Sequence, residues 1–205
     1  MKKEIIKIVL ILLVLSIFSC KSNNLRINDY GNPNKALLVI DMQIDYIREN
    51  GKFTIENKQI ENLINITNKI IDDYYKDNYK IIYLRNIFKE TDFKNRFRNY
   101  AIIEGSLGIE IDPRINIVSK YVYDKYTPDA FSNINFENFL IENQINELSL
   151  CGFMADQCVY RTAISAYNKG YIVNYFENAV GSSNVRNIEN AIKKLSKKGI
   201  NIIKY

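Results

Sequence analysis

LSLCGFMADQCVYRTAISAYNKGYIVNY, residues 148–175, is the stretch of the sequence that decides the fold. Its apolar start at 148–151 predicts a buried strand, 156–168 predicts a helix, and 171–175 predicts a second strand. A strand, a helix and a strand in close succession form a parallel βαβ unit. The helix returns the chain to the end of the sheet where the first strand began, so the second strand runs in the same direction. We therefore expect the same alternation on both sides of this stretch.

The flanking sequence continues the alternation. Further strands are expected at 36–40, 81–84, 121–123 and 200–203, and further helices at 58–77, 93–102, 134–143 and 184–197. A chain of 205 residues that is 47% hydrophobic is long enough for one such domain and too short for two of ordinary size. We predict the α/β class, as a Rossmann-like three-layer sandwich with a six-stranded, mostly parallel sheet and helices on both faces.

The N-terminal region predicts export rather than a folded element. A basic start at 1–3 precedes an apolar run at 5–18, which is too short to span a membrane and typical of a signal peptide. Because the run ends in a small residue followed by Cys20, we predict a lipoprotein signal peptide with lipidation of Cys20. The expected parts are a signal peptide at 1–19, a polar tether at 20–34 and a folded domain at 35–205. The expected location is the bacterial cell envelope, lipid-anchored to a membrane on the periplasmic or cell-surface side; a plain secretory peptide and an uncleaved anchor are the alternatives.

Composition excludes several classes of function. The formal net charge is +5, without a basic stripe interleaved with aromatic residues, so no nucleic-acid partner is expected. The chain contains no histidine, which excludes catalysis by Ser-His-Asp or Cys-His groups. A zinc or iron site would lack its commonest ligand, so we expect no metal and no other cofactor.

Reactive side chains occur near the ends of three predicted strands. Asp41, Lys125 and Cys158 each follow the carboxyl end of a strand at a short distance along the chain. In a parallel sheet these ends share one edge, so an acid, an ammonium and a thiol could converge there. Each residue also has a structural interpretation: Asp41 as a helix cap, Lys125 as a surface charge and Cys158 as a small buried hydrophobe.

The expected helix start places Cys158 in a first turn. Asp156 is predicted to be the N-cap, and Cys158 then lies where the helix dipole favours an anion and lowers a thiol pKa. We expect a thiolate near neutral pH, with free backbone N–H groups that could hold an oxyanion. Cys151 ends an apolar strand and is expected to be buried and inert.

Four segments resemble one known family. They are KALLVIDMQIDYI at 35–47, EGSLGIEIDPR at 104–114, DKYTPDAFSN at 124–133 and LCGFMADQCVYRTAISAYNKGYIV at 150–173. In this order they are similar to the isochorismatase-like cysteine hydrolases, which include nicotinamidases and N-carbamoylsarcosine amidases, and the resemblance extends over 35–203. It implies a hydrolase that cleaves a small amide, ureido or imide-like C–N bond through a thioester acyl-enzyme.

The resemblance also implies roles for individual residues. Cys158 would be the nucleophile, Asp41 the general base and acid, and Lys125 the cation that keeps the other two charged and oriented. The backbone amides of Met154 and Cys158 would form the oxyanion hole, next to a cis peptide between Phe153 and Met154. The substrate pocket would be lined by Gln43, Tyr46, Phe131 and Gln157.

The sequence departs from the family pattern in two places. Nicotinamidases carry an Asp/His metal cluster beside the active site, and the lack of histidine weakens the case for nicotinamide as the substrate. Near the nucleophile, Ala155 replaces the usual threonine and Gln157 precedes the cysteine, and both can alter the substrate pocket. The alternative functions are vinyl-ether hydrolysis as in isochorismatase, a non-catalytic surface lipoprotein that acts as a binding module, and a thiol redox role of Cys151 with Cys158. The expected partners are a small amide-type molecule, the membrane, and further copies of the chain in a homodimer or tetramer.

Replacing Cys20 tests the expected location. Cys20→Ala should abolish the incorporation of labelled fatty acid and release the protein from membranes, because the lipid is attached at this thiol. Metabolic labelling and membrane fractionation measure the two effects. Equal membrane retention of the variant, together with no label on the wild type, contradicts the lipoprotein prediction and favours an uncleaved anchor.

Overall fold

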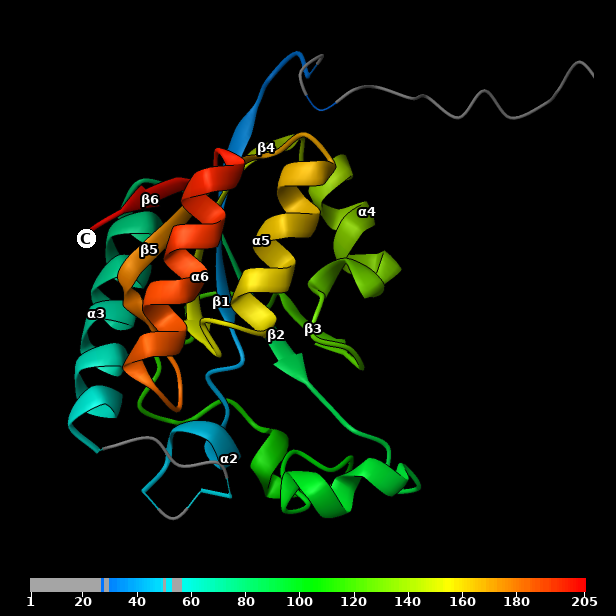
Figure 1. The fold of residues 1–205 in the computed structure, drawn as a ribbon. Helices are drawn as coiled ribbons and strands as arrows, with labels where there is room; N and C mark the ends of the chain where they lie inside the picture. Colours follow the sequence, from blue (N-terminus) through cyan, green and yellow to red (C-terminus); the bar gives the residue numbers. More distant parts are fainter. Residues whose placement is uncertain (1–26, 28–29, 50, 53–56) are drawn as a thin grey trace, which may run out of the picture.

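A six-stranded sheet lies at the centre of the computed structural model (Figure 1), which describes residues 27, 30–49, 51–52 and 57–205. The strands are β1 (Asn34–Ile40), β2 (Lys80–Asn86), β3 (Val122–Lys125), β4 (Ile145–Phe153), β5 (Ile172–Gly181) and β6 (Asn201–Ile203). The helices are α2 (Ile44–Ile47), α3 (Asn57–Lys76), α4 (Ile134–Glu142), α5 (Cys158–Asn168) and α6 (Val185–Lys198), with the 3₁₀ helices η2 (Phe93–Arg98), η3 (Leu107–Ile109) and η4 (Ala130–Ser132). The expected signal peptide, Cys20 and most of the expected tether lie outside the described residues.

The strand order determines where a ligand is expected. The order is β3-β2-β1-β4-β5-β6, and every neighbouring pair is parallel. The direction of winding reverses between β1 and β4, and ligands of such sheets bind at the carboxyl ends of the strands at this point. At that edge Ile40 pairs with Gly152, and on the neighbouring strands Asn86 pairs with Lys125. The predicted α/β class with a Rossmann-like parallel sheet is confirmed.

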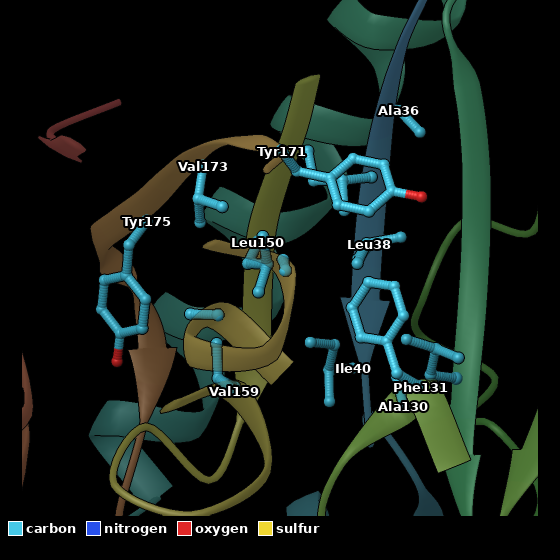
Figure 2. Close-up of a cluster of buried hydrophobic side chains, with 14 of the residues drawn as sticks. Ala36, Leu38, Ile40, Ala130, Phe131, Leu150, Val159, Tyr171, Val173 and Tyr175 are labelled. Carbon is cyan, nitrogen blue, oxygen red and sulfur yellow. The ribbon is translucent and has the colours of Figure 1, made fainter. Parts of the chain in front are cut away.

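Both faces of the sheet are buried, which explains the unbroken apolar runs of its strands. Ala36, Leu38 and Ile40 of β1 pack in the core on the face covered by α4, α5 and α6 (Figure 2). The alternate residues of β1, Leu37 and Val39, pack on the opposite face, against α3. Figure 1 shows α5 and α6 side by side over one face. The strand that leads to Asp41 is therefore held from both sides.

Most predicted elements are present with shifted ends. β3 extends through Lys125, so this residue occupies the last position of the strand instead of following it. The short helix expected at 93–102 is a 3₁₀ helix at 93–98. Within the residues that the structure describes, no helix is both long enough and apolar enough to cross a membrane.

The start of α5 differs from the prediction. The helix begins at Cys158, and Gln157 occupies the N-cap position without a side-chain hydrogen bond. The predicted N-cap is wrong because the Asp156 carboxylate accepts a hydrogen bond from Ser182 Oγ at 2.6 Å and is thereby engaged with the end of β5. Cys158 is thus the first helical residue, one place closer to the free helix terminus than a capped start at Asp156 would allow.

Gly152 marks a very close approach of β4 to β1. Its φ is +120°, and a Cβ atom at this position would lie 2.0 Å from the Ile40 carbonyl oxygen. Glycine is required here because the opposing atom belongs to the backbone of a central strand, which cannot move aside. The close approach brings the end of β1 against the turn that leads from β4 to α5.

Substitution of Gly152 should destabilise the fold strongly. We expect Gly152→Ala to lower the free energy of unfolding by about 3 kcal/mol or more, because the added methyl group collides with Ile40. Gly170→Ala is the matched control: Gly170 also has a positive φ, +96°, but no atom lies within 4 Å of an added Cβ. Its expected loss is only about 1 kcal/mol. Urea unfolding measures both values, and equal losses would show that backbone conformation alone explains the glycine.

Candidate active site

Asp41 directly follows the last residue of β1 and is fully buried. Its φ is +53°, in the left-handed region that aspartate enters more readily than most residues. Its backbone N–H donates to the Leu84 carbonyl oxygen at 2.8 Å, which fixes the turn out of the sheet. A non-glycine residue held at positive φ at the centre of the sheet edge is typical of a functional position.

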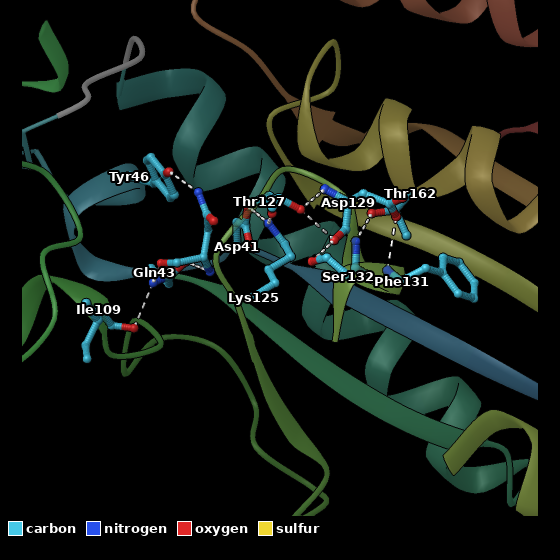
Figure 3. A network of polar contacts seen from close by, with 12 residues as sticks. Asp41, Gln43, Tyr46, Ile109, Lys125, Thr127, Asp129, Phe131, Ser132 and Thr162 are labelled. Atoms are coloured by element: carbon cyan, nitrogen blue, oxygen red, sulfur yellow. Dashed lines mark hydrogen bonds and ion pairs between the residues drawn. The ribbon is translucent and has the colours of Figure 1, made fainter. Parts of the chain in front are cut away.

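Lys125 forms a buried ion pair with Asp41 (Figure 3). Its Nζ lies 2.9 Å from Asp41 Oδ2, and both side chains are 0% exposed. Nζ also donates to the Thr127 carbonyl oxygen at 3.4 Å. The second carboxylate oxygen, Asp41 Oδ1, is buried and makes no hydrogen bond of ordinary length to any described residue. It is therefore the oxygen available for proton transfer.

The loop after β3 is tied to α5. Asp129 Oδ2 accepts a hydrogen bond from Ser165 Oγ at 2.5 Å, and the Ala130 N–H donates to Thr162 Oγ1 at 3.2 Å. Ser165 and Thr162 both belong to α5, whose first residue is Cys158. The elements that carry the ammonium and the thiol are thus fixed relative to each other, a connection that the sequence pattern did not reveal.

Cys158 is nearly buried, with 5% of its surface exposed. As the first residue of α5, it has a backbone N–H without an acceptor inside the helix. Burial, followed by the negative charge of Asp41, raises the pKa of the thiol to about 12, although Lys125 acts in the opposite direction. The expected thiolate near neutral pH is therefore wrong for the resting site, because burial beside a carboxylate outweighs the helix terminus.

The other two groups determine where the thiol proton can go. Burial raises the pKa of Asp41 above its usual value, despite the opposing effect of Lys125. Burial lowers the pKa of Lys125, but Asp41 and Cys158 raise it by more, so its pKa is raised and the ammonium persists. The 2.9 Å contact between Asp41 and Lys125 is an ion pair of a carboxylate and an ammonium, beside the Cys158 thiol. A carboxylate with a raised pKa beside a thiol can accept its proton and later return it.

The turn between β4 and α5 surrounds the thiol with backbone groups. The peptide between Phe153 and Met154 is cis. The next residue, Ala155, is held by its carbonyl oxygen, which accepts a hydrogen bond from the Tyr175 hydroxyl at 3.0 Å. Met154 and Cys158 lie at the two ends of this fixed turn, and the oxyanion role of their amides stays a prediction.

Two of the four expected pocket residues, Tyr46 and Gln43, lie beside Asp41 in Figure 3. Burial, followed by the charges of Asp41 and Cys158, raises the pKa of the Tyr46 hydroxyl well above its usual value. Gln43 is buried with both ends of its amide engaged: Nε2 donates to two backbone carbonyl oxygens, and Oε1 accepts from the Asn86 N–H at 2.8 Å. Tyr46 thus adjoins the reactive groups, whereas Gln43 fixes the end of β2.

Phe131 and Gln157 have different surroundings. The Phe131 ring packs against Phe136 and Tyr171, with centroids 5.3 Å and 5.7 Å apart, in the core that Figure 2 shows. Gln157 is exposed and borders a surface hollow together with Lys194 of α6. Their contribution to the substrate pocket stays a prediction.

Asn86 is a site residue that the sequence reasoning missed. It is the last residue of β2, is 2% exposed, and pairs in register with Lys125. Its backbone N–H also helps to stabilise the Asp41 carboxylate. The signal was a polar residue at the carboxyl end of a parallel strand, but the predicted strand stopped at Leu84 and left Asn86 in a loop.

The side chains of this chain do not fit the metal cluster of nicotinamidases. The sequence has no histidine, and among the residues that the structure describes no three cysteine or carboxylate side chains converge on a point that could hold a metal ion. No reaction step at this site is therefore assigned to a metal.

Cys151 and Cys158 are both free and pack on opposite faces of the sheet. Cys151 is fully buried, its Sγ contacts the Leu38 carbonyl oxygen at 3.6 Å, and burial raises the pKa of its thiol to about 12. A disulfide between the two would have to pass through the sheet. This geometry removes the support for a redox role of the pair.

The sequence and the fold of this chain match those of known proteins. The isochorismatase domain model matches residues 35–204. An uncharacterised isochorismatase family protein, PncA, of Bacillus subtilis (strain 168) is 30% identical over 168 residues, covering 73% of this chain and 87% of that protein. The crystal structure of nicotinamidase PncA from Bacillus subtilis has a TM-score of 0.75 and 27% identity, covering 84% of this chain and 100% of the other. N-carbamoylsarcosine amidase from Thermoplasma acidophilum shares the fold, with a TM-score of 0.73 at 22% identity over 83% of this chain and 96% of its own.

Alkylation kinetics test the electrostatics of the site. Iodoacetamide should label Cys158 before the fully buried Cys151, and the rate should rise about tenfold per pH unit between roughly pH 7 and pH 10 because the thiol pKa is about 12. Lys125→Met should slow the labelling, since the ammonium lowers the thiol pKa. Asp41→Asn should accelerate it by roughly tenfold, since the carboxylate raises that pKa.

Mass spectrometry of the labelled peptides measures these rates, and thermal melting of each variant controls for folding. A rate that reaches a plateau below about pH 8 would mean that Cys158 is a thiolate at rest. Preferential labelling of Cys151 would contradict the choice of nucleophile.

Proposed function

Because this chain belongs to the isochorismatase family, we propose that it is a cysteine hydrolase that cleaves a small amide, ureido or imide-like C–N bond. The observation that carries the proposal is the position of Cys158 at the start of α5, beside the buried Asp41–Lys125 pair. A nucleophile, a proton acceptor and a fixed cation are the groups that acyl transfer needs in a chain without histidine.

The first half of the proposed reaction forms a thioester. The Cys158 thiol passes its proton to Asp41 as sulfur attacks the substrate carbonyl carbon, and the carbonyl π electrons move to oxygen. The backbone N–H groups of Met154 and Cys158 hold the resulting oxyanion. When the oxyanion collapses, the C–N bond breaks and the nitrogen takes the proton from Asp41, so ammonia or an amine leaves and the acyl group stays on sulfur.

The second half restores the thiol. A water molecule gives a proton to Asp41 as its oxygen attacks the thioester carbonyl, and the new tetrahedral intermediate collapses with cleavage of the C–S bond. Sulfur recovers a proton from Asp41, and the acid is released. Lys125 keeps its charge throughout and offsets whichever negative charge the site carries, on carboxylate, oxyanion or sulfur. The raised pKa of Asp41 supports its use as base and acid in turn.

The known relatives support the substrate class. The nicotinamidase from Bacillus subtilis, whose structure matches 84% of this chain, is by its name an amide hydrolase. N-carbamoylsarcosine amidase, which shares the fold, is named for a ureido substrate. Vinyl-ether hydrolysis needs no sulfur nucleophile, and a binding module needs neither the thiol nor the buried ion pair. Both alternatives are therefore outcomes of the experiment and not the favoured reading.

We also propose that the enzyme acts at the bacterial cell envelope, held by a lipid on Cys20. The support is the N-terminal sequence, in which a basic start and an apolar run lead to this cysteine. A membrane-held hydrolase with this active site would act on small molecules that reach the envelope.

A screen of small primary amides, ureido acids and cyclic imides, with release of ammonia or amine as the readout, tests the function. The wild type should hydrolyse at least one compound, and Cys158→Ala should lose at least about 1,000-fold in kcat/KM because the nucleophile is gone. Cys151→Ala is the matched control, and it should keep activity within about threefold because its thiol lies on the other face of the sheet.

The same assay separates the alternatives. Hydrolysis of isochorismate that survives Cys158→Ala would favour the vinyl-ether reaction. Retention of a small molecule without turnover, unchanged in Cys158→Ala, would favour a binding module. Prior treatment with a chelator should leave amide hydrolysis unchanged, and a loss of activity that returning zinc or iron reverses would contradict the metal-free mechanism.

A further inference from the structure

Asn86 places an amide side chain next to the reactive groups. It ends β2, pairs in register with Lys125, and its backbone N–H contributes to stabilising the Asp41 carboxylate. Its side chain points to Tyr46, because Nδ2 donates to the Tyr46 hydroxyl at 3.4 Å. Because Lys125, its register partner, is the residue paired with Asp41, the Asn86 amide lies within the same buried group.

The backbone of Asn86 is clamped from both sides. Its N–H donates to Gln43 Oε1 at 2.8 Å, and its carbonyl oxygen accepts from Gln43 Nε2 at 2.9 Å. Gln43 is itself fully buried, so this clamp is shielded from water. A residue whose main chain is fixed in this way presents its side chain in one direction, which is the requirement for recognising a substrate group.

The side-chain oxygen of Asn86 lacks a donor. Oδ1 is buried, and no hydrogen bond reaches it from any described residue. Buried acceptors in proteins are nearly always paired, so one without a partner in an active site indicates a place for a ligand donor. Asp41 Oδ1 is buried without an ordinary hydrogen bond as well. The site thus contains two buried acceptor oxygens, one on Asn86 and one on Asp41.

We propose that Asn86 is a positioning and specificity residue whose Oδ1 accepts an N–H of the substrate. This inference rests on the proposed C–N hydrolysis. A primary amide or ureido nitrogen carries two N–H groups. One can donate to the unpaired Asn86 Oδ1, while the nitrogen stays within reach of Asp41, which must later return a proton to it. An ester of the same acid has no N–H to offer. Asn86 would therefore make the site select unsubstituted amides and ureas over esters.

The test compares amides and esters that share an acyl group. The pairs are benzamide with methyl benzoate, propionamide with methyl propionate, and the best amide of the ammonia-release screen with its methyl ester. Asn86→Leu keeps the side-chain size but has no acceptor. It should lower kcat/KM for the amides by roughly 10- to 100-fold and for the esters by less than about threefold, since only the amides lose a hydrogen bond.

Asn95→Leu is the matched control. Asn95 is also buried with an unpaired Oδ1, but its Nδ2 donates to the Lys89 and Glu90 carbonyl oxygens and closes a local turn. This variant can lose stability, but it should leave the ratio of amide to ester hydrolysis unchanged. The alkylation rate of Cys158 in Asn86→Leu, expected to match that of the wild type within about threefold, reports whether the thiol and its neighbours keep their arrangement.

The outcomes separate this inference from the proposed function. If the wild type hydrolyses the amides and Asn86→Leu loses amide and ester activity equally, the role of Asn86 in selecting N–H groups is wrong while the amidase function stands. If the wild type hydrolyses the esters alone, or neither member of any pair, the amidase function fails and the inference fails with it. A selective loss for the amides, absent in Asn95→Leu, supports the proposal.

Discussion

The buried ion pair between Asp41 and Lys125 is the interaction on which the site depends. Both side chains are withdrawn from water and lie 2.9 Å apart, so each charge is acceptable only in the presence of the other. Removing one partner would leave an uncompensated buried charge, which costs roughly 3–5 kcal/mol in proteins. The pair also sets the electrostatics of Cys158, because the carboxylate raises the thiol pKa and the ammonium lowers it. Stability and reactivity therefore share the same two residues.

The fold supplies this pair by bringing strand ends together. Asp41 follows β1, Lys125 ends β3 and Asn86 ends β2, three positions far apart in the sequence that meet at one edge of the parallel sheet. The close passage of Gly152 against Ile40 brings the turn before α5 to the same edge. Hydrogen bonds between the loop after β3 and α5 then fix the ammonium relative to the thiol.

Cys158 is a protonated thiol in the resting site, whereas its place at a helix N-terminus alone would favour a thiolate. A helix N-terminus contributes about half of a unit positive charge, and here the thiol is also buried beside a full negative charge. Burial and the Asp41 charge therefore raise the thiol pKa by more than the helix terminus lowers it. In the proposed reaction the thiol loses its proton to Asp41 only when it attacks a bound substrate. Asn86 Oδ1 is buried as well and accepts no hydrogen bond from a described residue. The site therefore combines a protonated nucleophile with an unpaired acceptor oxygen.

The sequence by itself determined the parallel sheet, the edge at which its strands end, and the acid, ammonium and thiol groups near that edge. Apolar runs such as 36–40 and 148–151 are visible without tertiary information, because strands buried on both faces need no polar positions. The rule that parallel strands end at one edge makes Asp41, Lys125 and Cys158 candidates, and the resemblance to a known family implies their roles. The tertiary structure alone decided the helix start at Cys158, the engagement of Asp156 with Ser182, the paired amide of Gln43 and the raised thiol pKa. These properties depend on partners distant in sequence and on the exclusion of water, and no local pattern of residues encodes either one.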